Sequence, residues 1–245
     1  MKKKKYKSKT ILITGGSSGI GLNLAKHFLN KGMKVINISR TNSKIKNKNL
    51  VNINFDLNNF EKYNNLFKKY RKTLKNINYF VYSAGIHDLK PINAFTYQSI
   101  TKSININLLA PILLSKYLSQ RKIFSKLNSI VFISSVMGVV GAPGQVVYSS
   151  TKSGVIGLTK SLSLELTKNK IRVNCLSPGV IKESKLFKDY SKSITKDKAQ
   201  AVIDSHPLRI GSFRDVNGAV EFLINNDSGW FTGQNFILDG GYSSQ

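Results

Sequence analysis

The stretch T-I-L-I-T-G-G-S-S-G-I-G, residues 10 to 21, is a short apolar strand that runs into a glycine-rich turn. An amphipathic helix follows directly, and its apolar side carries Leu22, Leu24, Ala25, Phe28 and Leu29. Gly15 permits the tight turn, and Gly19 and Gly21 let the backbone approach a pyrophosphate, which the helix N-terminus favours electrostatically. Such a glycine pattern recurs by chance in loops, but between a strand and a helix it indicates a dinucleotide-binding turn.

Strand-like and helix-like stretches alternate along the rest of the chain. The strand-like stretches lie near residues 10–14, 34–39, 51–55, 79–82, 129–134, 171–176 and 235–238, and the helical ones near 20–31, 59–74, 97–119, 148–168 and 213–225. This alternation implies right-handed crossovers and a parallel sheet covered on both faces. We therefore predict an α/β fold with a single Rossmann-type, doubly wound parallel sheet of about seven strands.

A second stretch, I-S-S-V-M-G-V-V-G-A-P-G-Q-V-V-Y-S-S-T-K, covers residues 133 to 152. Tyr148 and Lys152 are four positions apart and share one face of a helix. An ammonium group beside a phenol favours the phenolate, so we expect Lys152 to lower the pKa of Tyr148 by roughly three units. Ser135 is placed to hydrogen-bond the oxygen that receives the proton. The set suits proton transfer at a carbonyl or alcohol oxygen while a hydride moves at carbon.

Taken together, these motifs resemble the short-chain dehydrogenase/reductase family, and within it the 3-oxoacyl-(acyl-carrier-protein) reductases and their relatives. Further family motifs follow in the expected order over essentially the whole chain: S-A-G at 83–85, I-N-I-N-L-L-A-P around Asn107, Pro178-Gly179 after R-V-N-C-L-S, and T-G-Q-N-F-I-L-D-G-G at 232–241. The resemblance implies an NAD(P)-dependent oxidoreductase that reduces a ketone to a secondary alcohol. It also implies a catalytic tetrad of Asn107, Ser135, Tyr148 and Lys152.

The resemblance assigns a role to each tetrad residue. Tyr148 gives its proton to the carbonyl oxygen that Ser135 holds, and Lys152 binds the ribose of the nicotinamide nucleotide. Asn107 kinks its helix and holds a water that links Lys152 to solvent. Asn105 competes for this role, but the L-L-A-P that follows Asn107 fits the family pattern better. The residues expected to contact the cofactor are Gly15, Ser17, Ser18, Gly19, Ile20, Gly21, Arg40, Asp56, Leu57, Ser83, Ala84, Gly85, Tyr148, Lys152, Pro178, Gly179 and Ile181.

The end of the second strand bears on the choice of cofactor. An acidic residue there accepts the ribose hydroxyls and repels a 2′-phosphate, but this chain has the neutral Ser39. Arg40 follows and offers a planar charged fork that suits a phosphate. In so basic a chain, Arg40 is alternatively a solvent-facing loop charge. We favour NADP(H) over NAD(H), and the resemblance implies that Asp56 contacts the adenine amino group.

Two departures from the family pattern stand out. Residues 182–207 are polar, charged and poorly periodic, which is typical of a solvated loop, and in the family this region forms a mobile lid. The family usually carries a Thr shortly after Pro-Gly, whereas here a hydroxyl appears only at Ser184, and we expect it to serve one position later. Ser83 stands where the family most often has Asn; we expect weaker support of the cofactor turn, with a hydroxyl that still hydrogen-bonds.

The formal net charge is +26 and the sequence pI is about 10.1. This charge either attracts an acidic partner or reflects drift toward AT-rich codons, and we favour drift because the lysines are scattered along the chain. No nucleic-acid motif and no metal-ligand spacing is present, so we predict no specific nucleic acid and no metal. No apolar run reaches the ~18 residues of a membrane span.

The chain begins M-K-K-K-K-Y-K-S-K, and we predict a basic mobile tail over residues 1–9, followed by one catalytic domain over 10–245. No apolar signal region follows these charges, so export is not expected. The single cysteine, Cys175, lies in an apolar run and is expected to be a buried thiol in a reducing compartment. These observations favour a cytoplasmic protein.

Two classes of function are compatible with the sequence: an oxidoreductase, and a basic binding protein on the same fold. The intact tetrad favours the enzyme. Its substrate is either a β-ketoacyl thioester on an acidic carrier protein or a free small ketone, alcohol or sugar. For the carrier protein, we expect a docking patch near the active-site side formed by Lys126, Lys168, Lys170 and Arg172.

The resemblance also implies a homotetramer or homodimer. The helices near 97–119 and 148–168 are expected to pair across a two-fold axis, and the C-terminal tail to contribute to a second interface. Apolar candidates for the helix interface, each of which alternatively faces the sheet, are Tyr117, Leu118, Ile156, Leu158 and Leu162.

Overall fold

Seven parallel strands form one sheet in the order β3-β2-β1-β4-β5-β6-β7. They are β1 (Thr10–Thr14), β2 (Lys34–Ser39), β3 (Leu50–Asn54), β4 (Tyr79–Tyr82), β5 (Ser129–Ile133), β6 (Arg172–Pro178) and β7 (Asn235–Leu238). The structure is a computed structural model and describes residues 6–120 and 122–244. The predicted doubly wound sheet is confirmed. Its strand order reverses between β1 and β4, the switch point at which such sheets bind ligands.

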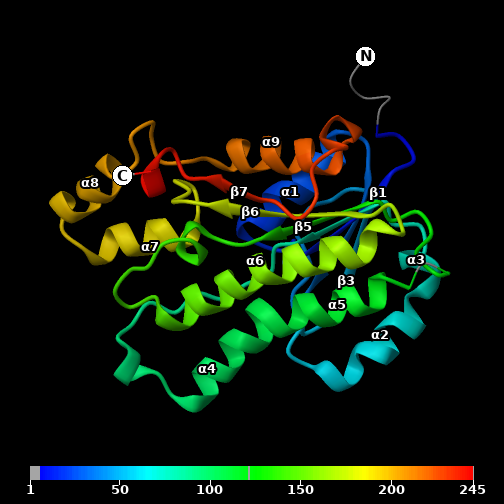
Figure 1. Ribbon diagram of the computed structural model, residues 1–245, viewed down its shortest axis with the longest axis horizontal. Coiled ribbons are helices and arrows are strands. Elements are labelled where there is room, and N and C mark those ends of the chain that lie inside the picture. The colour runs from blue at the N-terminus through cyan, green and yellow to red at the C-terminus, as the bar shows by residue number, and fades with distance from the viewer. Residues whose placement is uncertain (1–5, 121, 245) are drawn as a thin grey trace.

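Helices cover both faces of the sheet (Figure 1). One face carries α1 (Gly19–Asn30) and α9 (Phe213–Ile224), which pack against each other. The other face carries α2 (Tyr63–Lys69), α3 (Arg71–Leu74), α4 (Tyr97–Ile104), α5 (Ala110–Leu118) and the long α6 (Val146–Thr167). The helix predicted over 59–74 is therefore divided, with a short 3-10 turn at Phe60–Lys62 ahead of α2 and α3.

Each face of the sheet has its own apolar core. Successive side chains of a strand point to opposite faces, so Leu12 packs in the core under α5 and α6, while Ile11 and Ile13 pack under α1 and α9. All five residues of β1 are buried. This is why β1 is a continuous apolar run in the sequence instead of an alternating one.

A π-helical turn at Asn105–Leu109 separates α4 from α5. Such turns widen the helix locally and leave a carbonyl free. Here the Tyr82 hydroxyl donates to the carbonyl of Ile106 at 2.5 Å, which joins the turn to the end of β4. The single helix predicted over 97–119 is thus interrupted at the position where the family resemblance implied a kink.

The segment over residues 182–207 contains two short helices, α7 (Lys185–Ser193) and α8 (Lys196–Asp204), which the sequence did not predict. Each begins at a hydroxyl that caps its first turn: Ser184 Oγ accepts from the amide of Phe187 at 3.1 Å, and Thr195 Oγ1 from that of Lys198 at 3.4 Å. We call this segment the lid. No residue of α8 is buried, so a hydrophobic period could not reveal it.

The N-terminal boundary also differs from the prediction. Residues 1–5 of the expected tail lie outside the described residues. Tyr6, however, is only 3% exposed and packs in the core under α1 and α9. Its carbonyl accepts from the amide of Lys9 at 3.0 Å. The packed domain therefore includes Tyr6 and does not begin at Thr10. Within the described chain, no helix has the length and apolar character needed to cross a membrane.

Candidate active site

The glycine turn lies at the switch point, between the ends of β1 and β4. Gly15 has a φ of +71°, and its amide donates to the carbonyl of Ile38 at 2.9 Å. A Cβ on Gly21 would lie 2.4 Å from the carbonyl oxygen of Gly15, so the start of α1 touches the turn too closely for any side chain. Thr14 Oγ1 accepts from the amides of Ser83 at 3.0 Å and Ala84 at 3.2 Å. This shape leaves backbone amides at a helix N-terminus, as a pyrophosphate site requires.

Asn37 of β2 supports the turn and was missed by sequence reasoning. It is fully buried, and its Oδ1 accepts from the amide of Gly16 at 2.8 Å. Its Nδ2 donates to Ser39 Oγ and to Asn52 Oδ1, both at 2.9 Å. The available signal was one amide residue inside the apolar strand K-V-I-N-I-S, since a buried polar side chain must be hydrogen-bonded.

The hydrogen bond expected of the Ser83 hydroxyl is not formed: this buried hydroxyl has no hydrogen-bond partner among the described residues. Support comes instead from Thr14, which accepts from the Ser83 amide, and from Asn37 on the neighbouring strand β2, which accepts from the Gly16 amide.

The residues expected to select the cofactor lie at the ends of β2 and β3. Ser39 is 7% exposed, and its hydroxyl donates to the carbonyl of Thr41 at 2.6 Å. Arg40 is exposed, and its guanidinium has no hydrogen bond or ion pair within residues 6–120 and 122–244. Asp56 is exposed, accepts from the amide of Asn58 at 2.9 Å, and precedes the buried Leu57. Arg40 and Asp56 are therefore available to a ligand at this edge of the sheet.

The first two turns of α6 carry Tyr148 and Lys152. Lys152 is 5% exposed, and its ammonium donates to the carbonyl of Ile133 at 2.9 Å, at the end of β5. The ammonium nitrogen lies 5.5 Å from the centre of the Tyr148 ring. Ser134 Oγ donates to the carbonyl of Lys152 at 2.8 Å, and Ser135 begins the turn that follows. The end of β5 and the start of α6 thus bring Ser135, Tyr148 and Lys152 together.

The protonation of this pair differs from the sequence-based expectation. Burial raises the pKa of Tyr148 to about 12, and a hydrogen bond with Ser135 offsets part of this effect. Burial lowers the pKa of Lys152 to about 8, with a small opposing contribution from the Cys175 thiol. The predicted lowering of the Tyr148 pKa by Lys152 is therefore wrong in this geometry, because the ammonium is directed at the carbonyl of Ile133. Tyr148 therefore keeps its proton at neutral pH.

Asn107 is 1% exposed and holds the backbone after β4. Its Nδ2 donates to the carbonyl of Ile86 at 2.9 Å, and its Oδ1 accepts from the Ile86 amide at 2.9 Å. A Cβ on Gly85 would lie 3.4 Å from Asn107 Oδ1 and 3.6 Å from the Lys152 ammonium nitrogen, so both groups flank Gly85. Asn105 instead donates to Asn58 Oδ1 at 2.9 Å near the surface. The structure brings Asn107, and not Asn105, to the tetrad.

His87 is a second residue that sequence reasoning missed. Its ring makes an edge contact with the ring of Tyr148, with centroids 4.4 Å apart. Its Nε2 is 2.8 Å from Gln145 Oε1, at the start of α6. No motif marked His87, and the only available signal was a titratable side chain two positions after S-A-G.

The end of β6 forms the base of the lid. The amide of Gly179, next to Pro178, donates to the carbonyl of Leu238 at 2.9 Å. Ile181 is 4% exposed and pairs with Gly211. Because Ser184 Oγ is engaged as the cap of α7, its proposed contact with the cofactor competes with that hydrogen bond.

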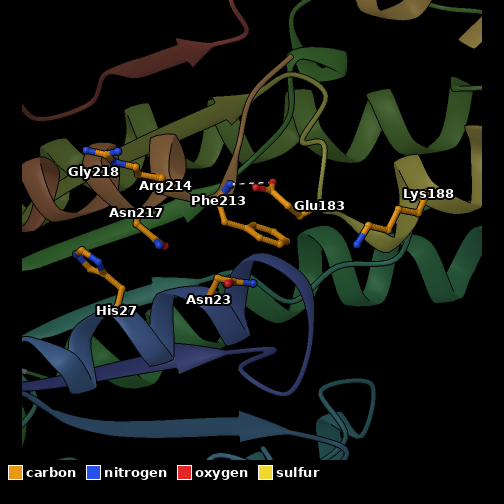
Figure 2. Close-up of a pocket in the computed structure, with 8 residues that line it drawn as sticks. All are labelled: Asn23, His27, Glu183, Lys188, Phe213, Arg214, Asn217 and Gly218. Atoms are coloured by element: carbon orange, nitrogen blue, oxygen red, sulfur yellow. Dashed lines mark hydrogen bonds between the residues drawn. The ribbon is translucent and has the colours of Figure 1, made fainter. Parts of the chain in front are cut away.

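A hollow of about 640 Å³ lies between α1, α9 and the first part of the lid (Figure 2). It is lined by Asn23, His27, Glu183, Lys188, Phe213, Arg214, Asn217 and Gly218. None of the tetrad residues lines it. Glu183 accepts from the amide of Phe213 at 3.3 Å, and this bond, dashed in Figure 2, joins the lid to the start of α9.

The expected docking patch lies at the opposite end of the strands from the tetrad of the same chain. Lys126 precedes β5, and Lys168, Lys170 and Arg172 lie between the end of α6 and the start of β6. These are the amino ends of the strands, whereas the tetrad lies at their carboxyl ends. The length of the strands separates the patch from the tetrad, so the patch is not on the active-site side of its own chain.

Comparisons with known proteins agree with the fold and with the family resemblance. The sequence pattern described as short chain dehydrogenase matches residues 9–195. The 3-oxoacyl-(acyl-carrier-protein) reductase FabG of Rickettsia typhi is 35% identical over 245 residues, which cover 96% of this chain and 97% of that protein. The crystal structure of a short chain dehydrogenase from Leptospira borgpetersenii with bound NAD+ has a TM-score of 0.88 at 30% identity, covering 98% of this chain and 95% of that chain. ElxO with NADP bound has a TM-score of 0.86 at 32% identity, covering 97% and 100%.

A parallel sheet with a glycine turn at its switch point and a Tyr-Lys pair at the same edge defines an NAD(P)-dependent oxidoreductase that acts on alcohol or ketone groups. The chain belongs to the short-chain dehydrogenase/reductase family and is similar to the family's 3-oxoacyl-(acyl-carrier-protein) reductases.

Proposed function

We propose that the protein is an NADP(H)-dependent reductase that converts a ketone to a secondary alcohol, with Tyr148 as the proton donor. The observation that carries the proposal is that Tyr148, Ser135 and Lys152 lie together at the carboxyl ends of the strands, the same end of the sheet as the glycine turn. The turn fits a dinucleotide because Gly15 and Gly21 leave no room for side chains, so that the turn packs closely against the N-terminus of α1. A bound nicotinamide cofactor supplies the hydride.

The residues of the chain handle the proton and the position of the carbonyl. In the proposed reaction, the Ser135 hydroxyl holds the carbonyl oxygen and Tyr148 donates its phenolic proton to that oxygen. Negative charge then develops on the Tyr148 oxygen, and the positive charge of the nearby Lys152 ammonium, whose pKa is about 8, stabilises it at neutral pH. Asn107 keeps the loop after β4 in place through its two bonds to Ile86.

The preference for NADP(H) rests on the end of β2. Arg40 is exposed and free of partners within the described chain, and Ser39 brings no negative charge that would repel a 2′-phosphate. Replacing Ser39→Asp together with Arg40→Ala is expected to reverse the preference, since one partner is lost and a repelling charge is gained. The ratio of the kcat/KM values for NADPH and NADH, in wild type and in the double variant, measures this preference. A wild type that already prefers NADH contradicts this part of the proposal.

For the substrate, we favour a 3-oxoacyl thioester on an acyl carrier protein, as the name of the Rickettsia typhi relative suggests. The alternative is a small sugar or another free ketone or alcohol. Around the loops that border Tyr148, the exposed apolar side chains Leu89, Val139 and Val146 favour an acyl group over a sugar.

We also propose a homodimer or homotetramer in which α5 and α6 pair across a two-fold axis. Leu118 and Leu162 are buried in the core and do not contribute, whereas Ile112 and Leu164 are 39% and 77% exposed. A two-fold axis would run the two copies of α6 antiparallel. The basic patch at the end of one α6 would then lie beside the tetrad of the partner subunit, where a carrier protein has to dock.

A second interface is proposed at β7 and α9. Four apolar side chains are exposed there: Phe222, Trp230, Phe231 and Ile237. Trp230 is 98% exposed, which is costly for a side chain of this size in a monomer. Size exclusion with light scattering is expected to give a tetramer, and a monomer would contradict both interfaces. We place the enzyme in the cytoplasm, in keeping with the single buried Cys175.

The test of the proposed activity is NADPH oxidation against a small set of carbonyl compounds. Acetoacetyl thioesters on carrier protein and on a free thiol are compared with simple ketones and sugars. We expect the carrier-bound thioester to have the highest kcat/KM, and Tyr148→Phe to abolish every rate. Oxidation supported best by a sugar or simple ketone would favour the alternative substrate, and no oxidation with any carbonyl would contradict the proposal.

A further inference from the structure

His87 occupies a position that packing alone does not explain. Its ring stands nearly perpendicular to that of Tyr148, with an interplanar angle of 88° and a centroid separation of 4.4 Å. An apolar ring would make the same contact at no polar cost. Instead His87 carries a buried Nδ1 that has no hydrogen-bond partner among the described residues. Unpaired buried polar atoms destabilise a fold, so a position that retains one suggests a purpose beyond packing.

The other ring nitrogen fixes the imidazole. Nε2 lies 2.8 Å from Gln145 Oε1, and an amide oxygen only accepts hydrogen bonds. The neutral tautomer that suits this contact has its proton on Nε2. Burial, the largest effect, lowers the pKa of His87, and the charge of Lys152 acts in the same direction. The bond to Gln145 and the charge of Asp88 oppose this shift. The ring beside Tyr148 is therefore neutral at neutral pH.

Both ends of this contact are held in place. On one side, the two bonds between Asn107 and Ile86 fix the residue that precedes His87. On the other side, Gln145 precedes the first residue of α6, and its carbonyl accepts from the amide of Ser149 at 2.7 Å. A continuous set of contacts thus leads from Asn107 through His87 to the turn of α6 that carries Tyr148.

We propose that His87 is a positioning residue for Tyr148: held by Gln145 and by the loop that Asn107 anchors, it sets the orientation of the phenol and keeps a neutral group beside it. This inference rests on the proposed function, in which Tyr148 donates the proton. It adds that the start of α6 and the loop after β4 act on Tyr148 through one imidazole.

The first experiment replaces His87→Phe and Gln145→Leu. Phenylalanine keeps the ring contact and removes both the unpaired nitrogen and the bond to Gln145. We expect thermal stability to be kept or increased, NADPH affinity to be unchanged, and kcat to fall about tenfold or more, since small errors in position cost that much. Gln145→Leu is expected to lower kcat in the same way. A His87→Phe variant with wild-type kcat would show that the residue serves packing only.

The second experiment changes the charge of the ring. In Gln145→Glu a carboxylate accepts from Nε2 and stabilises the imidazolium, which raises the pKa of His87. A cation beside Tyr148 makes the phenol a stronger acid, so kcat for reduction is expected to rise about threefold or more as pH falls through the titration of His87. The step should be absent in the double variant Gln145→Glu with His87→Phe. A kcat that stays flat across the titration would overturn the proposal.

A measurement without turnover separates this inference from the proposed function. NMR of ring-labelled tyrosine, with the Tyr148 signal assigned from Tyr148→Phe, follows that ring against pH. We expect a step near pH 8 from Lys152 in every variant and a second step at lower pH from His87. The second step moves to higher pH in Gln145→Glu, vanishes in His87→Phe and persists in the control His27→Phe. Absence of the second step in wild type overturns the contact while leaving the proposed activity intact. A clear second step without carbonyl reduction overturns the proposed activity, and the positioning role with it.

Discussion

The tetrad and the lid both lie at the carboxyl ends of the strands, but different interactions hold them in place. Around the tetrad, three polar side chains are buried and hydrogen-bonded: Asn37, Asn107 and Lys152 are 0%, 1% and 5% exposed. No residue of α8 is buried, and the lid is attached at its base by the pairing of Ile181 with Gly211 and by the bond from the Phe213 amide to Glu183. The difference teaches that buried hydrogen bonds fix the side chains around the proposed active site, whereas the lid is held only at a few points.

Among the substitutions around the tetrad, Tyr148→Phe has the largest expected effect, which is on kcat. It removes the proton and leaves the ring contact with His87, so kcat should fall about a thousandfold or more while NADPH affinity is kept. Steady-state rates measure kcat, and a fluorescence titration with NADPH measures the cofactor affinity. If the variant retains more than about a tenth of wild-type kcat, Tyr148 is not the proton donor.

Gly21→Ala should disrupt the glycine turn. The new Cβ would lie 2.4 Å from the Gly15 carbonyl oxygen, and forcing it in costs about 1–3 kcal/mol of stability. Cofactor affinity should fall about tenfold or more, because the turn must open. Gly218→Ala is the matched control, since no atom lies within 4 Å of its Cβ position in α9 and alanine favours a helix. Equal cofactor affinities for the two variants would contradict this account of the turn.

Asn37→Ala tests the support of the turn from β2. The amide of Gly16 loses its acceptor, which costs about 1–3 kcal/mol. We expect weaker cofactor binding and a lower unfolding temperature, measured by calorimetry with and without NADPH. Ser83→Ala is the comparison, because its hydroxyl makes no bond in the described chain and its loss should change neither quantity. If Ser83→Ala weakened cofactor binding more than Asn37→Ala does, Ser83 and not Asn37 would be the residue that supports the glycine turn.

The pH dependence of reduction reports the state of Lys152. Its pKa is lowered to about 8, so the ammonium is charged below that pH and loses its charge above it. We expect kcat/KM to fall about tenfold per pH unit above the pKa. Tyr148 keeps its proton to higher pH because burial raises its pKa to about 12. A Lys152→Arg variant that retains activity should lose the limb near pH 8, since arginine stays charged; an unchanged limb would assign it to another group.

Ser184→Ala should have the smallest effect. It removes the cap of α7 and costs about 1 kcal/mol locally, in a segment that adds little to global stability. Hydrogen exchange should quicken across α7 while the unfolding temperature changes little. A large fall in the unfolding temperature would mean that the lid is part of the cooperative core.

The features that the sequence predicted differ from those that it missed in how far apart the interacting residues lie along the chain. The strands, the glycine turn and the Tyr148–Lys152 spacing were predictable because each depends on neighbours within a few residues. Asn37 and His87 were not, because their partners Gly16 and Tyr148 are distant in sequence. The pKa of Tyr148 was mispredicted for a similar reason: spacing places Lys152 on the same helix face, but the carbonyl of Ile133 directs its ammonium.

The same limit explains the lid and the basic patch. No residue of α8 is buried, so no apolar period marks it, and the local signals for α7 and α8 were the capping hydroxyls of Ser184 and Thr195. The patch around Lys170 was placed by its charge, but the edge of the sheet at which a residue lies depends on strand direction.

Transfer of deuterium from labelled NADPH to a carbonyl substrate tests the central claim most directly. We predict that deuterium appears on the carbinol carbon of the product in wild type, and that the new hydroxyl proton comes from an exchangeable donor. Tyr148→Phe should bind the same labelled cofactor and form no labelled product. Deuterium that stays on the cofactor, or that is found in water instead of on carbon, would contradict the account.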